Sequence, residues 1–165
     1  MFTVGVLTIS DKGASGERQD KSGEVIREII PSMDARIVNY DVIPDEKELI
    51  VAKLVKWVDE DDLDVLITTG GTGLAPRDVT PEATLAVVDR IVPGFAEAMR
   101  AESLKKTPHA MLSRAVVGTR GKCLIINLPG SPKAVRECLE VILPALPHAV
   151  ETLKGQAGEC GAAET

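Results

Sequence analysis

Hydrophobic residues in this chain occur as short continuous runs and as longer segments with helical spacing. In the first half, runs of Val, Leu and Ile predict buried strands over residues 3–10, 36–43 and 65–67. Apolar residues at three- and four-residue spacings predict a helix that begins at Asp20 or Ser22 and stops at Pro31. A second amphipathic helix has an apolar face that includes Leu49 and Trp57. This alternation predicts an α/β fold whose successive strands are parallel, because the crossovers between them are right-handed.

The second half of the chain predicts further helices and a change of strand direction. One helix begins at Thr80 and another at Val92, and the second is broken within residues 105–109. Two strands, over residues 115–118 and 122–128, surround an Arg120-Gly121 turn. We therefore expect an antiparallel hairpin joined to the mostly parallel sheet. A closing helix over residues 134–153 contains prolines that require a break or a kink.

A glycine-rich loop joins the third strand to the next helix. Gly70, Gly71 and Gly73 allow left-handed backbone conformations that turn consecutive N–H groups toward one point, which predicts an anion cradle. Thr80 is expected to cap the following helix, with Pro81 at its first position. A sharp turn without a ligand would explain a lone glycine motif equally well. The polar residues around it, which are Thr68, Thr69, Arg77 and Asp78, favour a ligand.

A second loop repeats this chemistry. It follows the strand that ends at Leu128 and contains a glycine, a capping Ser131, a proline at the first helical position and Lys133. A lysine at a helix N-terminus opposes the helix dipole, which suggests an anion between them. Ligands of open α/β sheets bind at the carboxyl ends of the strands. The polar loops expected at that edge are Ser10 to Gly16, Pro44-Asp45, Thr69 to Asp78 and Asn127 to Lys133.

Two acidic residues in these loops are candidate metal ligands. A glycine cradle with paired carboxylates suits a magnesium nucleotide, which makes Asp45 and Asp78 candidates for Mg²⁺. Simpler explanations exist for both residues. Asp45 forms a capping-box pattern with Glu48, and Asp78 could form a surface salt bridge with Arg77. Lys133 is by default a solvated lysine.

Composition narrows the function classes. The 165 residues, of which 44% are hydrophobic and 27% charged, are typical of one soluble globular domain. The chain has only four aromatic residues and a net charge of −6, which argues against nucleic-acid binding. An anionic ligand must therefore be bound by local groups, such as backbone N–H groups, helix ends, a few basic side chains or a divalent metal. Cys123, Cys138 and Cys160 have no CxxC spacing, so neither a disulfide framework nor a zinc site is indicated. No signal peptide or run of membrane-spanning length is evident, and we expect a cytoplasmic protein without membrane contact.

Several motifs together resemble the MogA/MoaB family of molybdenum cofactor biosynthesis proteins. They are Thr68 to Gly73 followed by Arg77 to Ala83, and Asn127 to Lys133. Met111 to Arg114 and Ile142 to Ala149 are similar to the G domain of gephyrin and its plant counterpart. The resemblance extends from the first strand to about Lys154 and implies a three-layer αβα fold. We expect one domain over residues 1–154, followed by a flexible tail over residues 155–165.

The resemblance implies a molybdopterin adenylyltransferase that uses ATP, Mg²⁺ and molybdopterin. Asp45 and Asp78 would be its catalytic, metal-linked carboxylates, and Ser113 would lie in the molybdopterin pocket. The other substrate-binding residues expected are Thr69, Gly70, Gly71, Thr72, Gly73, Ser131, Lys133, Ser10 and Asp11. A homotrimer is implied, with a molybdenum-insertion protein as a partner.

Two other functions fit part of the sequence. A non-catalytic molybdopterin-binding or scaffold module would have the same fold, because fold alone does not establish turnover. The presence of Asp45, Asp78 and Ser113 together favours catalysis. Another kind of nucleotide-binding α/β domain would explain the glycine loop but not the second loop.

Overall fold

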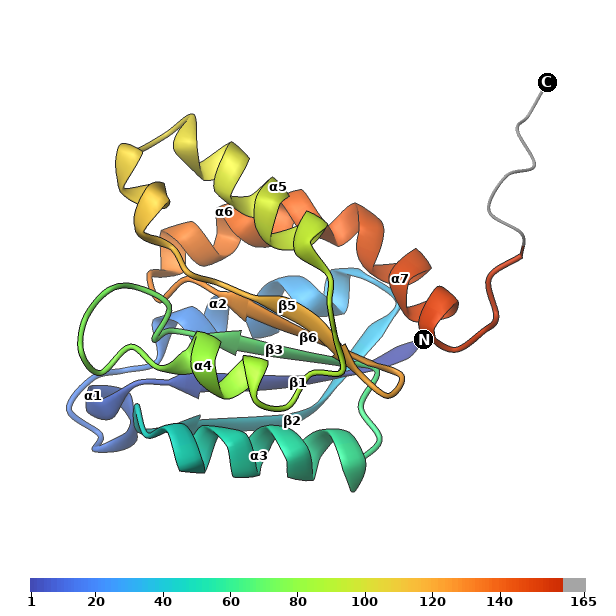
Figure 1. Cartoon of the computed structure of the whole chain (residues 1–165), viewed down its shortest axis with the longest axis horizontal. Coiled ribbons are helices and arrows are strands. Elements are labelled where there is room, and N and C mark those ends of the chain that lie inside the picture. Colours follow the sequence, from blue (N-terminus) through green and yellow to red (C-terminus); the bar gives the residue numbers. More distant parts are fainter. Residues whose placement is uncertain (159–165) are drawn as a thin grey trace.

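The computed structural model describes residues 1–158 and contains one mixed sheet of six strands (Figure 1). Along the sheet the order is β2-β1-β3-β6-β5-β4. The strands are β1 (Phe2–Ile9), β2 (Ala35–Ile43), β3 (Val65–Thr69), β4 (Arg90–Ile91), β5 (Val117–Arg120) and β6 (Cys123–Leu128). Strands β2, β1, β3 and β6 are parallel neighbours, whereas β5 pairs antiparallel with both β6 and β4. The predicted parallel sheet with an antiparallel hairpin is confirmed.

Helices cover both faces of this sheet and complete the three layers. One face carries α2 (Lys21–Ile29), α5 (Pro93–Leu104), α6 (Pro132–Ile142) and α7 (Leu146–Leu153). The other face carries α3 (Lys47–Asp59) and α4 (Thr80–Leu85). Each layer of helices encloses its own apolar core, so the central strands β1, β3 and β6 are buried on both sides. This explains why those strands are continuous hydrophobic runs rather than alternating ones.

Short helices and prolines mark the boundaries. A single turn, α1 (Asp11–Ala14), lies within the loop expected after the first strand. Three 3-10 turns, η1 (Ile30–Ser32), η2 (Pro108–Leu112) and η3 (Leu143–Ala145), each contain a proline in the first positions. The last of these separates α6 from α7, which confirms the break predicted in the closing helix. Asp20, rather than Ser22, caps α2, because its carboxylate accepts a hydrogen bond from the N–H of Gly23 at 2.9 Å.

Several local predictions were wrong. Strand β4 was not foreseen, because it has only two residues and both are exposed. Helix α2 ends at Ile29, and Pro31 lies in the following 3-10 turn. Thr80 is the first residue of α4 rather than its cap, which is Val79. Leu49 is 46% exposed and lies outside the apolar face assigned to α3.

The described part of the chain includes residues 155–158 of the predicted tail. Of the predicted tail, residues 159–165 lie outside the described part of the chain, as does Cys160. Cys123 and Cys138 are buried as expected. None of the helices in residues 1–158 has the length and apolar character needed to cross a membrane.

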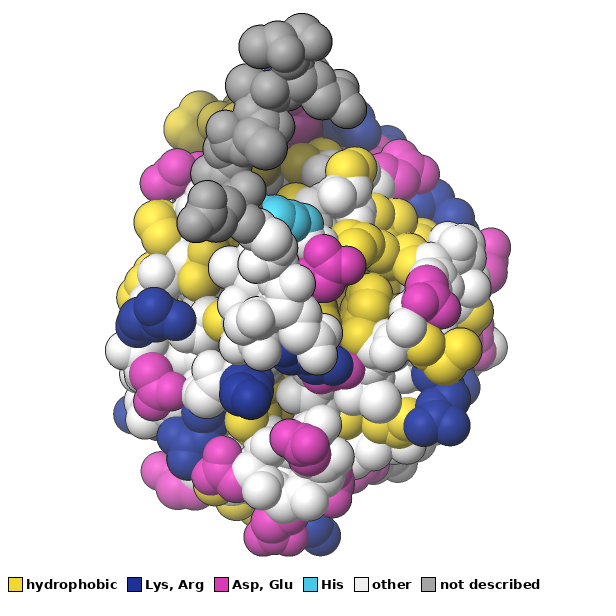
Figure 2. Space-filling view, turned by 90° about the vertical axis from the view of Figure 1, so that its right-hand side faces the viewer, with side chains coloured by type: hydrophobic (Ala, Val, Ile, Leu, Met, Phe, Trp, Pro, Cys, Tyr) yellow, Lys and Arg dark blue, Asp and Glu magenta, His cyan; other side chains and the backbone are white. Residues whose placement is uncertain are grey.

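The two ends of the strands form two different edges of the molecule. The carboxyl ends of β1, β2, β3 and β6 lead into loops on the left in Figure 1. The chain leaves β1 toward β2 on one side and returns to β3 on the other, so this edge contains the topological switch point. Figure 2 faces the opposite edge, where acidic and basic side chains are interspersed with apolar ones. We refer to these as the carboxyl edge and the amino edge.

Candidate active site

The glycine loop after β3 needs glycine at two of its three predicted positions. Gly70 and Gly71 have φ values of +97° and +67°, in the left-handed region that side chains disfavour. A Cβ on Gly70 would meet the carbonyl oxygen of Ile9, and one on Gly71 would meet the hydroxyl of Thr80. Gly73 is not among the residues with positive φ, so its backbone does not require glycine.

The loop is closed on itself and presents free donors. The N–H of Thr80 donates to the carbonyl of Gly71 at 3.1 Å, and its hydroxyl donates to the carbonyl of Gly70 at 2.9 Å. The N–H groups of Gly71, Thr72 and Gly73 donate no hydrogen bond to an acceptor in residues 1–158. Three consecutive donors are therefore available to a ligand, as the anion-cradle hypothesis requires.

The second loop lies directly against the first. The hydroxyl of Thr69 donates to the carbonyl of Pro129 at 2.6 Å, and the hydroxyl of Ser22 donates to that of Gly130 at 2.6 Å. Ser131 caps α6 as predicted, because its hydroxyl accepts from the N–H of Ala134 at 3.2 Å. Thr69, one of the predicted binding residues, is completely buried, so its hydroxyl joins the two loops.

Asp45 and Asp11 bind each other's backbone across two loops. The N–H of Asp11 donates to Asp45 Oδ2 at 2.8 Å, and the N–H of Asp45 donates to Asp11 Oδ1 at 3.0 Å. The capping-box explanation of Asp45 is therefore wrong, since Glu46 occupies the cap position of α3 without a side-chain hydrogen bond. Asp45 fixes the loops after β1 and β2 to each other instead.

Arg77 pairs with Asp11 rather than with Asp78. Its Nε and Nη2 atoms donate to the two oxygens of Asp11 at 3.0 and 2.8 Å. The carboxylate of Asp78 accepts through Oδ2 from the N–H of Ala75 at 3.0 Å. The surface salt bridge that offered a structural explanation of Asp78 is therefore not formed.

The pKa values of Asp45 and Asp11 are shifted in opposite directions. Burial raises the pKa of Asp45, and the negative charges of Asp11 and Asp78 add to this effect. The hydrogen bond from Arg77 lowers the pKa of Asp11. Asp45 is thus a half-buried acid with acidic neighbours, where a bound cation would relieve the cost of its charge.

This arrangement fits a metal shared with a ligand. Within residues 1–158, no group of three or more acidic, His or Cys side chains is placed to hold a metal by itself. Asp45 and Asp78 nevertheless line one cleft, and the Oδ1 atom of each accepts no hydrogen bond from another described residue. Mg²⁺ is commonly held by one or two carboxylates together with phosphate oxygens and water. Both residues fit that role.

Two clefts meet at the glycine loop. The first has a volume of about 420 Å³ and is lined by apolar side chains such as Met99, with Ser113 among its polar residues. The second has a volume of about 850 Å³ and a more polar lining. Gly71, Asp78 and Gly130 line both clefts and form the junction between them.

Most predicted site residues lie at these clefts, but two do not. The larger cleft contains Ser10, Asp45, Thr69, Gly70 and Ser131, and the smaller one contains Thr72, Gly73 and Ser113. Asp11 lines neither cleft, and its carboxylate forms an ion pair with Arg77. Lys133 is exposed and also lines neither cleft, so its role in anion binding remains a prediction.

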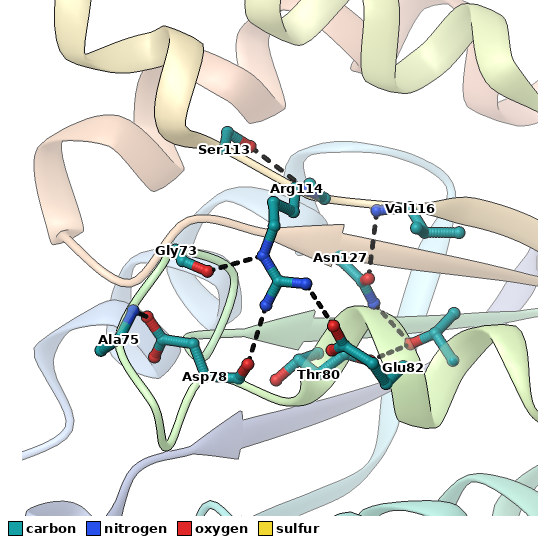
Figure 3. A network of polar contacts seen from close by, with 11 residues as sticks. Gly73, Ala75, Asp78, Thr80, Glu82, Ser113, Arg114, Val116 and Asn127 are labelled. Carbon is teal, nitrogen blue, oxygen red and sulfur yellow. Dashed lines mark hydrogen bonds and ion pairs between the residues drawn. The ribbon is translucent and has the colours of Figure 1, made fainter.

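Two residues whose contacts were not predicted, Arg114 and Asn127, support the loops of the site from behind. Arg114 contacts the glycine loop and Glu82 (Figure 3), although the sequence placed it only at the end of the motif from Met111 to Arg114. The completely buried Asn127 donates to the hydroxyls of Thr68 and Thr84 at 3.0 and 2.9 Å. A charged residue beside Ser113 in a recognised motif was the available signal for Arg114, whereas nothing local indicated the partners of Asn127.

Comparisons with known proteins find similar sequences and a similar fold. The family model described as a probable molybdopterin binding domain matches residues 5–148. Molybdopterin adenylyltransferase of Helicobacter pylori strain J99 is 47% identical over 154 residues, which cover 92% of this chain and 88% of that protein. The enzyme of the same name from Escherichia coli K12 is 42% identical over 166 residues, with coverage of 92% and 85%. A crystal structure of the molybdopterin biosynthesis enzyme MoaB from Thermus thermophilus has a TM-score of 0.90 and 54% identity, covering 94% of this chain and 98% of that one.

Proposed function

Because the chain belongs to the family with the molybdopterin binding domain, we propose that it is a molybdopterin adenylyltransferase. The proposed reaction transfers AMP from ATP to molybdopterin, giving adenylylated molybdopterin and pyrophosphate. Relatives at 42% and 47% identity over most of the chain have this name. The chain would then act in molybdenum cofactor biosynthesis, before molybdenum is inserted.

The observation that carries the proposal is the junction of two clefts beside three free N–H donors. A reaction between two phosphate-bearing substrates requires two binding pockets that meet where the phosphates react. We assign molybdopterin to the smaller cleft, which has apolar walls and contains Ser113. We assign ATP to the larger, more polar cleft, which contains Asp45.

The chemistry at the junction is limited by charge repulsion and alignment. A phosphate oxygen of molybdopterin forms a bond to the α-phosphorus of ATP, and the bond from that phosphorus to the oxygen bridging the β-phosphate breaks. Pyrophosphate leaves with the electron pair. The N–H groups of Gly71, Thr72 and Gly73 can donate to the negative oxygens without first giving up other partners. Two clefts that fix both substrates also supply alignment, which is a large part of catalysis in such reactions.

Asp45 and Asp78 would hold Mg²⁺ together with the phosphates of ATP. The metal would supply positive charge where two phosphate groups approach each other. The raised pKa of Asp45 supports this assignment, since a carboxyl group that is costly to ionise alone is stabilised by a cation. The guanidinium of Arg77 is paired with Asp11, so we assign the neutralisation of the phosphate charges to the metal and not to Arg77.

The direct test is a product assay with purified protein, molybdopterin, ATP and Mg²⁺. We expect pyrophosphate and adenylylated molybdopterin in equal amounts, and neither when molybdopterin or ATP is omitted. Binding of molybdopterin without pyrophosphate release would instead identify the non-catalytic binding module. Failure to bind molybdopterin would remove both functions.

Three further properties are part of the proposal. We propose a homotrimer, on the family resemblance and on exposed apolar side chains near η2, such as Met111 at 70% and Leu112 at 49% exposure. Light scattering that gives a monomer mass at micromolar concentration would exclude it. A molybdenum-insertion protein as partner follows from the resemblance. The cytoplasmic location follows from the sequence, in which no signal peptide or run of membrane-spanning length is evident. Both stay predictions.

A further inference from the structure

One arginine holds the glycine loop at several points. The side chain of Arg114 donates from Nε to the carbonyl of Gly73 at 2.8 Å and from Nη2 to the carbonyl of Asp78 at 2.8 Å. Its Nη1 pairs with a carboxylate oxygen of Glu82. Its backbone N–H donates to the carbonyl of Thr72 at 2.9 Å. Figure 3 shows the guanidinium between Gly73, Asp78 and Glu82, with a dashed line to each of them.

The side chain of Arg114 contacts both ends of the segment from Gly73 to Asp78. Gly73 is the last residue of the cradle, and Asp78 lies at the junction of the two clefts. Arg114 holds the carbonyls at both ends of this segment in a planar fork of donors. Because the peptide group is planar and trans, the contact at Thr72 also fixes the direction of the Gly73 N–H, which points away from its neighbouring carbonyl.

The charge of Arg114 is already engaged. Glu82 neutralises it, and the Arg114 guanidinium in turn lowers the pKa of Glu82. Because this guanidinium is paired with Glu82 and donates to two backbone carbonyls, we assign it to holding the loop and not to binding phosphate. The residue before it, Ser113, lines the smaller cleft, so one short segment contacts that cleft and the loop behind it.

We propose that Arg114 is a positioning residue of the adenylyl transfer: it acts on the reaction through the backbone of the glycine loop and the placement of Asp78, without touching either substrate. This inference rests on the proposed function for its kinetic consequence. Its geometric content, that the loop depends on Arg114 for its shape, can be tested separately.

The kinetic test compares two arginines in matched settings. Arg120 on the amino edge makes the same kinds of contact: its Nε and Nη2 donate to Asp59, and its Nη1 donates to the carbonyl of Val87 at 2.9 Å. Lysine at either position keeps the charge but cannot reproduce the fork. We expect Arg114→Lys to lower kcat about tenfold to a hundredfold, with little change in the KM for molybdopterin or ATP. Arg120→Lys should keep kcat within about twofold. The two variants should lose similar amounts of thermal stability relative to the wild type.

Two outcomes would overturn the proposal. One is a kcat of Arg114→Lys close to that of the wild type, and the other is an equal loss in Arg120→Lys, which would indicate general destabilisation. Glu82→Gln serves as the second variant, since it leaves both carbonyl contacts in place. It should lower kcat less than Arg114→Lys does.

Hydrogen exchange separates this proposal from the proposed function. The hydrogen-bonded amides of the loop, which are those of Gly70, Ala75 and Asp78, should exchange faster in Arg114→Lys than in the wild type, with or without turnover. Unchanged exchange would contradict the positioning role even in an active enzyme. Faster exchange in Arg114→Lys, when the wild type itself produces no pyrophosphate, would leave the positioning role intact and remove the proposed reaction.

Discussion

The two edges of the sheet carry clefts of nearly equal volume, about 420 Å³ for the smaller cleft of the carboxyl edge and about 430 Å³ for the cleft of the amino edge. Their polar groups differ. At the amino edge, Arg120 pairs with Asp59, Lys154 pairs with Asp64, and Asp89 accepts from the N–H of Gly121. At the carboxyl edge, consecutive backbone donors and two carboxylate oxygens have no partner in residues 1–158.

Cleft volume alone therefore does not identify the site: what distinguishes the carboxyl edge is a pair of carboxylates beside a glycine loop with left-handed backbone. A protein pairs its buried polar groups wherever it can, since leaving them unpaired costs free energy. The donors and carboxylate oxygens of the carboxyl edge that lack a partner among the described residues are therefore left to water or to a ligand. The predictions below test this contrast by changing equivalent residues at the two edges.

The largest effect is expected from the carboxylates. Asp78→Asn keeps an acceptor for the N–H of Ala75 and removes the charge, so we expect turnover to fall about a hundredfold or more. Asp45→Asn should behave similarly, because Asn can still accept from the N–H of Asp11. Asp59→Asn, at the amino edge, is the control and should turn over at the wild-type rate. Steady-state kinetics with molybdopterin, ATP and Mg²⁺ would measure this, and wild-type rates in both carboxyl-edge variants would remove the metal assignment.

A matched pair of glycines gives the next largest effect. Gly71 and Gly121 both have left-handed backbones, with φ of +67° and +55°. A methyl group on Gly121 meets nothing within 4 Å, whereas on Gly71 it meets Thr80 and Asp45. Both alanine variants should lose about 1 to 2 kcal/mol of stability from the backbone alone. Only Gly71→Ala should also lose nucleotide binding, as measured by calorimetry with ATP, and equal binding in the two variants would argue against a cradle at Gly71.

A smaller effect is expected on the pH dependence of stability, with opposite signs at the two edges. The folded-state pKa of Asp45 is raised above 3.8, so its charge costs stability at neutral pH, and that cost disappears as the pH falls below 3.8. The pKa of Asp59 is lowered by Arg120, so its charge stabilises the fold above pH 3.8, and this is lost as the pH falls through its folded-state pKa. Relative to the wild type at pH 7, Asp45→Asn should therefore raise the thermal midpoint and Asp59→Asn should lower it. Both differences should shrink at acidic pH.

The smallest effect is expected from Lys133. It is exposed and lines neither cleft, so Lys133→Ala should weaken ATP binding by no more than about threefold at low salt. Lys122→Ala, at the amino edge, is the control for a general change of net charge. A salt-independent loss confined to Lys133→Ala would show direct contact with the ligand. No loss at any salt concentration would make Lys133 a solvated lysine.

The fold could be predicted in most parts because its signals are local. Strands such as β6 are continuous apolar runs, and turns such as that at Gly121 have characteristic residues. The exposed pair Arg90–Ile91 has no such pattern, and it becomes a strand only because β5 lies beside it. The pattern of Asp45 and Glu48 imitated a capping box although the true partner of Asp45 is Asp11, 34 residues away.

The candidate site shows the same limit. Its glycines and Ser131 cap could be predicted, because their signals lie within a few residues. Arg114 could not, because Glu82, Asp78 and Gly73 lie 32, 36 and 41 residues from it. Spacing along the chain contains no information about such contacts, which only the packed sheet brings together.

The hydrogen bond from Ser22 to Gly130, which spans 108 residues, has a consequence for folding. Together with the Thr69 to Pro129 contact, it means that the junction of the two clefts cannot form until β6 has joined β3. Closing such long segments is the slow step for folds of high contact order, so the site is completed late. A ligand at this junction then binds only the fully folded chain, and it raises the apparent melting temperature as its free concentration increases.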